Sequence, residues 1–153
     1  MKICVAQIRP VKGNMATNIE NHKRLIGLAT SLNANAIFFP ELSITSYEPE
    51  LAKELATTQD DKRFDNFQQI SNTGNITIGF GVPTASGSGV KISMVIIQPK
   101  QQRQAYSKQQ LHSDELRYFV RGDKQIILRV SNERIAPAIC YESLQTNHSD
   151  TAH

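Results

Sequence analysis

The sequence has few cysteines, no long apolar run and no block of basic residues. Only two of its 153 residues are cysteine, Cys4 and Cys140. No apolar stretch approaches the roughly 18 residues that a membrane-spanning helix needs. Gln7 and Arg9 interrupt the apolar start too early for a secretory signal peptide. These absences predict a cytoplasmic protein that spans no membrane and whose thiols stay reduced rather than form a disulfide.

The charges are nearly balanced. Lys and Arg number 17 and are scattered among 14 Asp and Glu, which gives a net charge of +3. Such a chain has no electrostatic basis for binding nucleic acid or an anionic membrane. The length and the hydrophobic content of 39% fit one soluble domain over residues 1–153. The sequence offers no cluster of metal ligands, so no metal or cofactor is predicted.

The N-terminal part has the pattern of a strand, a helix and a second strand. Residues 2–8 form a nearly continuous apolar run, which predicts a strand covered on both faces. Asn14 can cap a helix over 15–32, where apolar residues recur at helical spacing. Residues 36–39 form a second buried strand, and we expect the two strands to be parallel neighbours. His22 lies near the apolar stripe of the helix and is interpreted as structural.

The rest of the chain alternates helical patterns with a run of short strands, which predicts a mixed α/β fold. The dipeptide turn signals of residues 86–89 predict a hairpin. Residues 109–124 lack clear periodicity, and long irregular stretches in compact domains tend to carry function. The expected elements are helices over 48–56 and 60–71 and strands over 76–82, 90–98, 105–108, 125–130 and 134–140.

Three reactive side chains stand at or just after predicted strand ends: Glu41, Lys108 and Cys140. A thiol needs a base or a nearby cation to become a useful nucleophile at neutral pH. A carboxylate and an ammonium supply both without histidine, and the ammonium can hold the oxyanion that forms during attack on an amide carbon. On position alone, ordinary polar strand ends and an inert thiol remain the simpler interpretation.

Short motifs around these residues occur together. The segments Phe39-Pro40-Glu41-Leu42, Tyr106-Ser107-Lys108-Gln109-Gln110-Leu111 and Ile139-Cys140-Tyr141-Glu142-Ser143 have the order and approximate spacing found in the nitrilase superfamily of carbon–nitrogen hydrolases. The opening strand with Gly13, Asn14 and Asn18 is similar as well. Glu115, with Phe119 and Gly122, resembles the acidic loop of that family. The resemblance extends over essentially the whole chain.

The resemblance implies an αββα sandwich and a role for each matched residue. Glu41 would be the general base, Lys108 the electrostatic stabiliser and Cys140 the nucleophile that forms a thioester. Glu115 would position Lys108 or the substrate, and the backbone N–H of Tyr141 would be the second oxyanion donor. The implied substrate is a small amide or nitrile, cleaved without metal or cofactor.

Length is the main departure from the family. Its members have about twice as many residues, so the resemblance implies the N-terminal portion of a carbon–nitrogen hydrolase, lacking the C-terminal half. An alternative is an inactive fragment that persists as a self-associating or binding module, because an uncovered sheet face exposes apolar surface. A homo-oligomer is therefore among the expected assemblies. A glutamine-fed amidotransferase domain or an acyltransferase relative is less favoured, because a fused synthetase domain and spanning helices are both missing.

Overall fold

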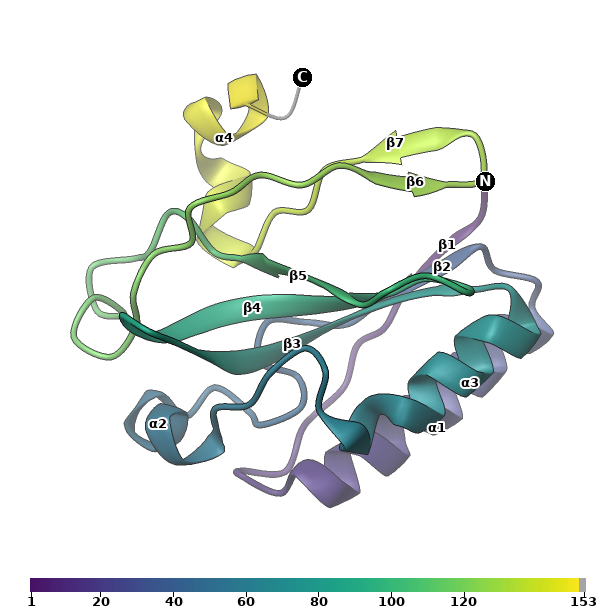
Figure 1. The fold of residues 1–153 in the computed structure, drawn as a ribbon, viewed down its shortest axis with the longest axis horizontal. Helices are drawn as coiled ribbons and strands as arrows, with labels where there is room; N and C mark the ends of the chain where they lie inside the picture. The colour runs from purple at the N-terminus through teal and green to yellow at the C-terminus, as the bar shows by residue number, and fades with distance from the viewer. Residues whose placement is uncertain (152–153) are drawn as a thin grey trace.

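The computed structural model describes residues 1–151, and they form a mixed α/β fold built on one five-stranded sheet. The order across the sheet is β1-β2-β3-β4-β5, and a separate two-stranded hairpin, β6-β7, lies over it (Figure 1). The strands are β1 (Ile3–Val5), β2 (Ala36–Phe38), β3 (Thr77–Ser86), β4 (Gly89–Ile97), β5 (Gln104–Ser107), β6 (Leu128–Val130) and β7 (Glu133–Ile135).

The helices are short except for two that lie against the sheet. They are α1 (Met15–Ser31), η1 (Pro49–Leu51), α2 (Ala52–Leu55), η2 (Lys62–Phe64), α3 (Asp65–Gly74), η3 (Cys140–Leu144) and α4 (Thr146–Thr151). The predicted helix over 48–56 is confirmed as η1 and α2. The predicted helix over 60–71 begins later and ends three residues further on, where Asn75 adopts the left-handed conformation that closes α3.

The predicted strand–helix–strand unit at the N-terminus is confirmed. Asn14 caps α1 by accepting a hydrogen bond of 3.0 Å from the Thr17 N–H. The strands β1 and β2 pair in parallel, with Cys4 opposite Ile37, and β3 continues the parallel part of the sheet. The carboxyl ends of these strands therefore share one edge of the sheet, which is where ligand sites of such sheets lie.

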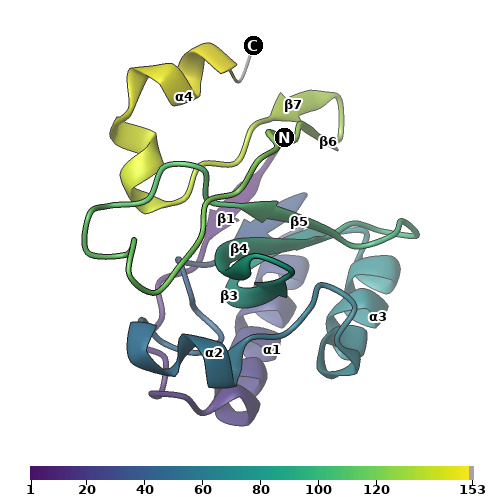
Figure 2. The same cartoon turned by 60° about the vertical axis from the view of Figure 1, so that its left-hand side comes forward.

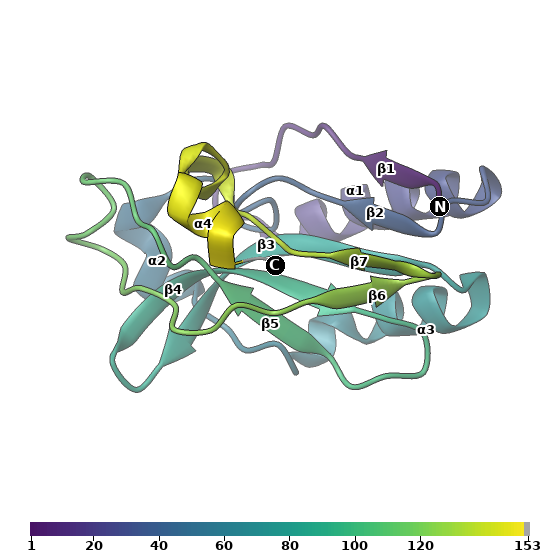
Figure 3. The same ribbon diagram turned by 90° about the horizontal axis from the view of Figure 1, so that it is seen from above.

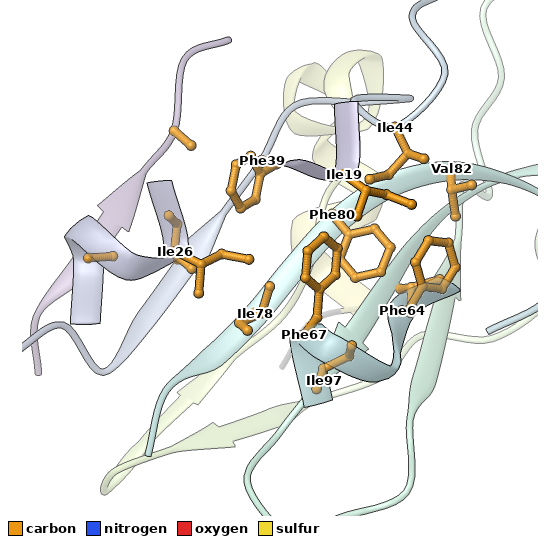
Figure 4. Packing of buried hydrophobic residues seen from close by; sticks show 14 of the residues in the cluster. Ile19, Ile26, Phe39, Ile44, Phe64, Phe67, Ile78, Phe80, Val82 and Ile97 are labelled. Atoms are coloured by element: carbon orange, nitrogen blue, oxygen red, sulfur yellow. The ribbon is translucent and has the colours of Figure 1, made fainter. Parts of the chain in front are cut away.

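One face of the sheet is covered by α1 and α3 (Figures 1 and 2). Phe64 and Phe67 from the second helical segment pack edge-on against Phe80 of β3, with ring centroids 4.8 and 5.1 Å apart. Figure 4 shows these rings between Ile19 on one side and Ile97 on the other. Aromatic pairs at this distance add about 0.5–1.5 kcal/mol to the burial of their area, so these contacts help to stabilise this face of the sheet.

The other face of the sheet carries the β6-β7 hairpin and the loop over residues 108–127 (Figure 3). Its apolar cluster includes Tyr106, Leu111, Phe119 and Ile139, all buried. The described chain thus has three layers, with helices, the main sheet and the hairpin stacked in that order. The hairpin at residues 86–89 is confirmed as the turn between β3 and β4.

The prediction that the first strand is covered on both faces was wrong. Ile3 and Val5 of β1 are 42% and 85% exposed, and only three of the residues from 2 to 8 are in strand conformation. Cys4 packs against the cluster under the helices, so its neighbours Ile3 and Val5 point to the opposite face of the sheet, where they are left exposed. An apolar run favours burial, but whether the strand is buried depends on whether another part of the fold packs against it.

Candidate active site

The loop that follows β2 places Glu41 at the carboxyl edge of the sheet. This loop lies directly on Gly81 of β3: a Cβ built there would be 2.2 Å from the Leu42 nitrogen and 2.5 Å from the Pro40 oxygen. The Ile44 N–H also donates to the Gly81 carbonyl at 3.0 Å. Glycine at position 81 is thus required for the close approach that sets the height of Glu41 above the sheet.

A buried histidine supports the same loop from below. His22 is fully buried in α1 and stacks on Phe39, with ring centroids 4.0 Å apart. Its Nδ1 lies 2.7 Å from the carbonyl oxygen of Asn18, so Nδ1 carries the proton and Nε2 accepts from the Ser43 hydroxyl at 3.0 Å. The Ser43 oxygen in turn accepts from the Gly81 N–H at 3.2 Å. Burial lowers the pKa of His22 from 6.5 to about 4, which keeps the ring neutral.

Lys108 follows β5 and lies between two carboxylates. Its ammonium donates to Glu41 Oε1 at 2.7 Å and to Glu115 Oε1 at 2.8 Å, and its side chain is only 1% exposed. Its backbone is bound on both sides, since its N–H donates to the Ile92 carbonyl at 2.8 Å and its carbonyl accepts from Gly122 at 2.7 Å. The lysine is therefore fixed both by its main chain and by its charge.

Glu115 is held by the irregular segment that the sequence marked as a candidate functional loop. Its Oε2 accepts from the backbone N–H of His112 at 2.7 Å. The Tyr47 hydroxyl lies 3.5 Å from Oε1. Burial, reinforced by the charge of Glu115, raises the pKa of Tyr47 above its ordinary value, so this phenol stays protonated and remains a hydrogen-bond donor.

The charges in this cluster shift each other's pKa. Burial raises the pKa of Glu41, and the hydrogen bond and positive charge of Lys108 offset only part of that rise. Burial alone would lower the pKa of Lys108, but the hydrogen bonds to Glu115 and Glu41 outweigh it and the pKa is raised. A carboxylate with a raised pKa and an ammonium that keeps its proton suit proton transfer and oxyanion binding, respectively.

Cys140 does not end a strand, contrary to the sequence-based prediction. The strand expected over 134–140 stops at Ile135, and Cys140 is the first residue of η3 with a left-handed φ of +49°. Pro137 has no N–H to donate to a strand ladder, and the Ile139 N–H donates at 2.8 Å to the side chain of Glu142 instead. The cysteine therefore stands on a sharp turn, with its side chain exposed.

The thiol of Cys140 lies within the field of the same charges. Burial raises its pKa, the negative charge of Glu41 raises it further, and the charge of Lys108 and the N–H of Tyr141 lower it. A hydrogen bond with Cys140 is also among the interactions that lower the pKa of Glu41. A thiol with a raised pKa is a poor nucleophile by itself, so it needs a base at hand. Glu41, which has a hydrogen bond with Cys140, is positioned to be that base.

All five residues predicted from the sequence line one open cavity of about 580 Å³. A second cavity, of about 370 Å³ and mainly apolar, meets the first at Glu41 and Cys140 and extends to Met94 and Gly81. The lining of the larger cavity consists of Glu41, Tyr47, Lys108, His112, Asp114, Glu115, Cys140, Tyr141, Ser143 and Leu144.

Sequence reasoning missed three residues at or beside this cavity: Tyr47, His112 and Glu142. Tyr47 comes from a loop whose sequence has no periodic signal, and His112 contributes its backbone N–H rather than its ring. Glu142 is fully buried although it is a charged residue two positions after the cysteine. Its acidic type was visible in the motif, but no sequence signal indicates that it is buried, because charged residues are almost never fully buried unless they are paired.

The described residues 1–151 contain no group of three or more His, Cys, Asp or Glu side chains arranged to hold a metal ion. None of the helices in that range is long and apolar enough to cross a membrane. Cys4 and Cys140 are both free thiols.

Comparison with known proteins gives consistent matches over nearly the whole chain. The model of the carbon–nitrogen hydrolase family matches residues 2–149. A curated relative, the glutamine-dependent NAD(+) synthetase of Acinetobacter baylyi, is 28% identical over 95% of this chain. Among solved structures, a CN-hydrolase superfamily protein from Xanthomonas campestris matches with a TM-score of 0.81 at 18% identity, and covers 91% of this chain. An amidase from Nesterenkonia sp. matches with a TM-score of 0.79 at 19% identity over 92% of it.

These matches confirm the predicted fold class, a nitrilase-like α/β sandwich of which about half is present. The chain spans 52% of the Xanthomonas protein and 56% of the Nesterenkonia amidase. It spans only 28% of the Acinetobacter synthetase. At these identities the solved structures establish the common fold, while the family model carries the relationship in sequence.

Proposed function

The chain belongs to the carbon–nitrogen hydrolase family, whose model covers residues 2–149, and from that premise we propose that it cleaves a non-peptide carbon–nitrogen bond of a small amide. In this proposal Cys140 is the nucleophile, Glu41 the general base and Lys108 the electrostatic stabiliser. Glu115 positions Lys108, and the backbone N–H of Tyr141 is the second oxyanion donor.

The first half of the reaction forms a thioester. Glu41 takes the thiol proton as the Cys140 sulfur attacks the amide carbon, and the electron pair of the C=O bond moves onto the oxygen. The Lys108 ammonium and the Tyr141 N–H stabilise that oxyanion. As the intermediate collapses, the C–N bond breaks and protonated Glu41 gives its proton to the departing nitrogen. Ammonia or an amine leaves.

The second half returns the enzyme to its starting state. Glu41 takes a proton from water as the water oxygen attacks the thioester carbon. The same oxyanion donors stabilise the second tetrahedral intermediate. Its collapse breaks the C–S bond, releases the carboxylic acid and gives the proton back to the sulfur of Cys140. The sum is amide plus water to carboxylic acid plus ammonia or amine, with no net oxidation or reduction.

One observation carries this proposal: the Lys108 ammonium is 2.7 Å from Glu41 Oε1, and both side chains line one cavity together with Cys140. The raised pKa of Glu41 supports a role as base, since it brings the carboxyl closer to the neutral range in which a general base works best. The raised pKa of Cys140 explains why a base is needed at all.

The test is release of ammonia from small primary amides by the full chain and by two cysteine variants. We expect turnover by the wild type and by Cys4→Ala, and none by Cys140→Ala. Mass spectrometry should find an acyl adduct on the peptide with Cys140 and not on the one with Cys4. Turnover by a folded Cys140→Ala variant would overturn the assignment. A wild type without turnover and without an adduct would favour the alternative of an inactive binding or self-associating module.

A specific substrate class has support from the relatives. The Acinetobacter baylyi protein that matches 95% of this chain is a glutamine-dependent NAD(+) synthetase. The second candidate function is therefore hydrolysis of the side-chain amide of glutamine to supply ammonia. Comparing ammonia release from glutamine with that from simple aliphatic amides decides between the two, because only the glutamine-specific enzyme would prefer glutamine by a large factor.

A further inference from the structure

Glu142 is a fully buried carboxylate that has no cationic partner. Its residue is 0% exposed, and among the described residues 1–151 no Lys or Arg forms an ion pair with it. The ammonium of Lys108 donates its hydrogen bonds to Glu41 and Glu115 instead. A buried charge is costly unless it is bound by other polar groups, so something else must satisfy it.

Four neutral donors satisfy the Glu142 carboxylate. The Tyr106 hydroxyl lies 2.9 Å from Oε1 and 3.0 Å from Oε2. The backbone N–H groups of Gln109 and Gln110 donate to Oε1 at 2.5 and 3.2 Å. The backbone N–H of Ile139 donates to Oε2 at 2.8 Å. Hydrogen bonds to an ionised acceptor are roughly twice as strong as neutral ones, which makes this a firm anchor.

These donors come from the two segments that carry the reactive groups. Tyr106 and Gln109 flank Lys108 along the chain, and Ile139 immediately precedes Cys140. In the fold, the turn that leads into α4 lies beside the end of β5 and the loop after it (Figures 1 and 2). One carboxylate therefore ties the Lys108 segment to the Cys140 turn.

The Cys140 turn itself is closed by the same residue. Cys140 has a φ of +49°, a conformation that residues other than glycine adopt rarely and at a cost of about 1–3 kcal/mol. The Glu142 N–H donates to the Ile139 carbonyl at 3.2 Å, while the Glu142 side chain accepts from the Ile139 N–H. The strained residue is thus enclosed between two hydrogen bonds that join its neighbours.

We propose that Glu142 is a positioning residue of the candidate active site: its cation-free carboxylate, bound by Tyr106 and by three backbone N–H groups, sets the distance between the Cys140 thiol and the Lys108 ammonium. This inference rests on the proposed function for its catalytic meaning, but its geometry stands without it. Glu142 is not among the residues that line either cavity at the site, so it acts through the two segments that it joins.

The chemistry of the anchor requires a carboxylate and not an amide. All four partners approach as donors, and a carboxylate is a pure acceptor. In a Glu142→Gln variant, the amide NH₂ would face either the Ile139 N–H or the two N–H groups of Gln109 and Gln110. Tyr106 can rotate its hydroxyl to accept, but a backbone N–H cannot. Either orientation therefore opposes donor to donor and pushes the two segments apart.

Separating the segments changes the electrostatics at the thiol. Lys108 lowers the pKa of Cys140, and the Tyr141 N–H on the turn lowers it as well. The negative charges of Glu41 and Glu115 act on the thiol in the opposite direction and raise its pKa. Displacing the turn changes the distance from the thiol to all three charged groups, so the alkylation profile of Cys140 should shift along the pH axis, while that of Cys4, which lies in β1, should stay in place.

The test measures alkylation of both thiols by iodoacetamide as a function of pH, with each site read separately by peptide mass spectrometry. In Glu142→Gln, the midpoint of the Cys140 profile should move by about half a pH unit or more, which changes the alkylation rate at neutral pH about threefold. The midpoint at Cys4 should not move. Glu133→Gln, an exposed glutamate in β7, is the matched control and should behave as the wild type at both sites.

A folded Glu142→Gln variant with the wild-type Cys140 midpoint overturns the proposal. If that variant does not unfold cooperatively in urea, Glu142→Asp decides, since it keeps the carboxylate but shortens its reach by one methylene group: a shifted midpoint at Cys140 supports the proposal and an unchanged one overturns it. Alkylation requires no amide turnover. A chain that fails to hydrolyse amides would thus defeat the proposed function and leave this measurement able to judge Glu142.

Discussion

Two segments meet at the candidate active site, and each is anchored by a buried ionisable side chain of a different kind. The loop that carries Glu41 packs on His22. The neutral ring of His22 donates one hydrogen bond to the Asn18 carbonyl and accepts one from the Ser43 hydroxyl. The turn that carries Cys140 rests on Glu142, which accepts from several donors at once. Both anchors lie outside the cavity, and both act on the backbone beside a reactive group.

The difference shows how protonation state limits each anchor. His22 works only as the neutral tautomer, because a protonated ring has no acceptor for Ser43. Its pKa is lowered from 6.5 in the unfolded chain to about 4 in the folded one. The folded state is therefore favoured above the unfolded value, and that stability is lost as the pH falls from 6.5 to about 4. At about 1.4 kcal/mol per pKa unit, this amounts to about 3 kcal/mol.

The largest effect is expected from Lys108, which lies between the two anchored segments. Lys108→Met leaves Glu41 and Glu115 buried without their cation, and breaking a buried pair in this way costs about 3–5 kcal/mol of unfolding free energy at neutral pH. This loss of unfolding free energy should be smaller in acid, because protonation of Glu41 and Glu115 removes the repulsion between their charges. Urea denaturation at two pH values measures it.

Lys53→Met, on the exposed face of α2, is the control for Lys108→Met and should change stability by less than about 0.5 kcal/mol. A Lys108→Met loss that stays the same in acid would show that the cluster is held by packing and not by charge. The stability of the Cys140 turn and of the Glu41 loop would then not depend on the charge of Lys108.

The next effect separates the two anchors by pH. Between neutral pH and pH 4, the wild type should lose about 3 kcal/mol more unfolding free energy than His22→Gln, whose side chain does not titrate. Glu41, with its raised pKa, works in the opposite direction but is the same in both proteins. Asn21→Gln, on the same helix, should follow the wild-type slope. Parallel slopes for wild type and His22→Gln would remove His22 as an acid-sensitive anchor.

A smaller effect is expected from the partner of His22. Ser43→Ala deletes the donor to His22 and leaves the buried Gly81 N–H without its acceptor, which should cost about 2 kcal/mol. The exposed Ser88→Ala should be nearly neutral. Thermal and urea unfolding of both variants give the comparison, and equal stabilities would mean that the loop is held by Gly81 and Ile44 alone.

The smallest effect belongs to the Glu142 side. Tyr106→Phe removes one donor, while three backbone N–H groups still bind the carboxylate, so a loss of about 1 kcal/mol is expected. Tyr118→Phe serves as the control. A loss above about 3 kcal/mol would show that the hydroxyl, rather than the backbone donors, carries this anchor.

Local signals in the sequence predicted most of the helix-covered layer. The cap at Asn14 and the apolar spacing behind it predicted α1, and the turn residues 86–89 predicted the β3–β4 hairpin. The exposure of Val5 could not be predicted in the same way, because it depends on whether a neighbour is present and not on β1 itself.

The site was only partly predictable. The resemblance of short motifs indicated Glu41, Lys108 and Cys140. Their residue types and positions alone did not distinguish them from the polar residues that commonly follow strands. The segment before Cys140 has the apolar pattern of a strand. It is not a strand because Pro137 lacks an N–H and because the Ile139 N–H donates to the side chain of Glu142. Tyr106 is 36 residues away from Glu142, and no local pattern contains that pairing.

The separation along the chain of the groups around Lys108 has a consequence for folding kinetics. Lys108 and Glu41 are 67 residues apart, while β3 and β4 are joined by a tight turn. Contacts of long sequence separation form late, because the entropy of closing the intervening loop must be overcome first. The β3–β4 hairpin can therefore form early, whereas Lys108, which has Glu115 only seven residues away, meets Glu41 only when most of the sheet is in place. The candidate active site would then be assembled in the last step of folding.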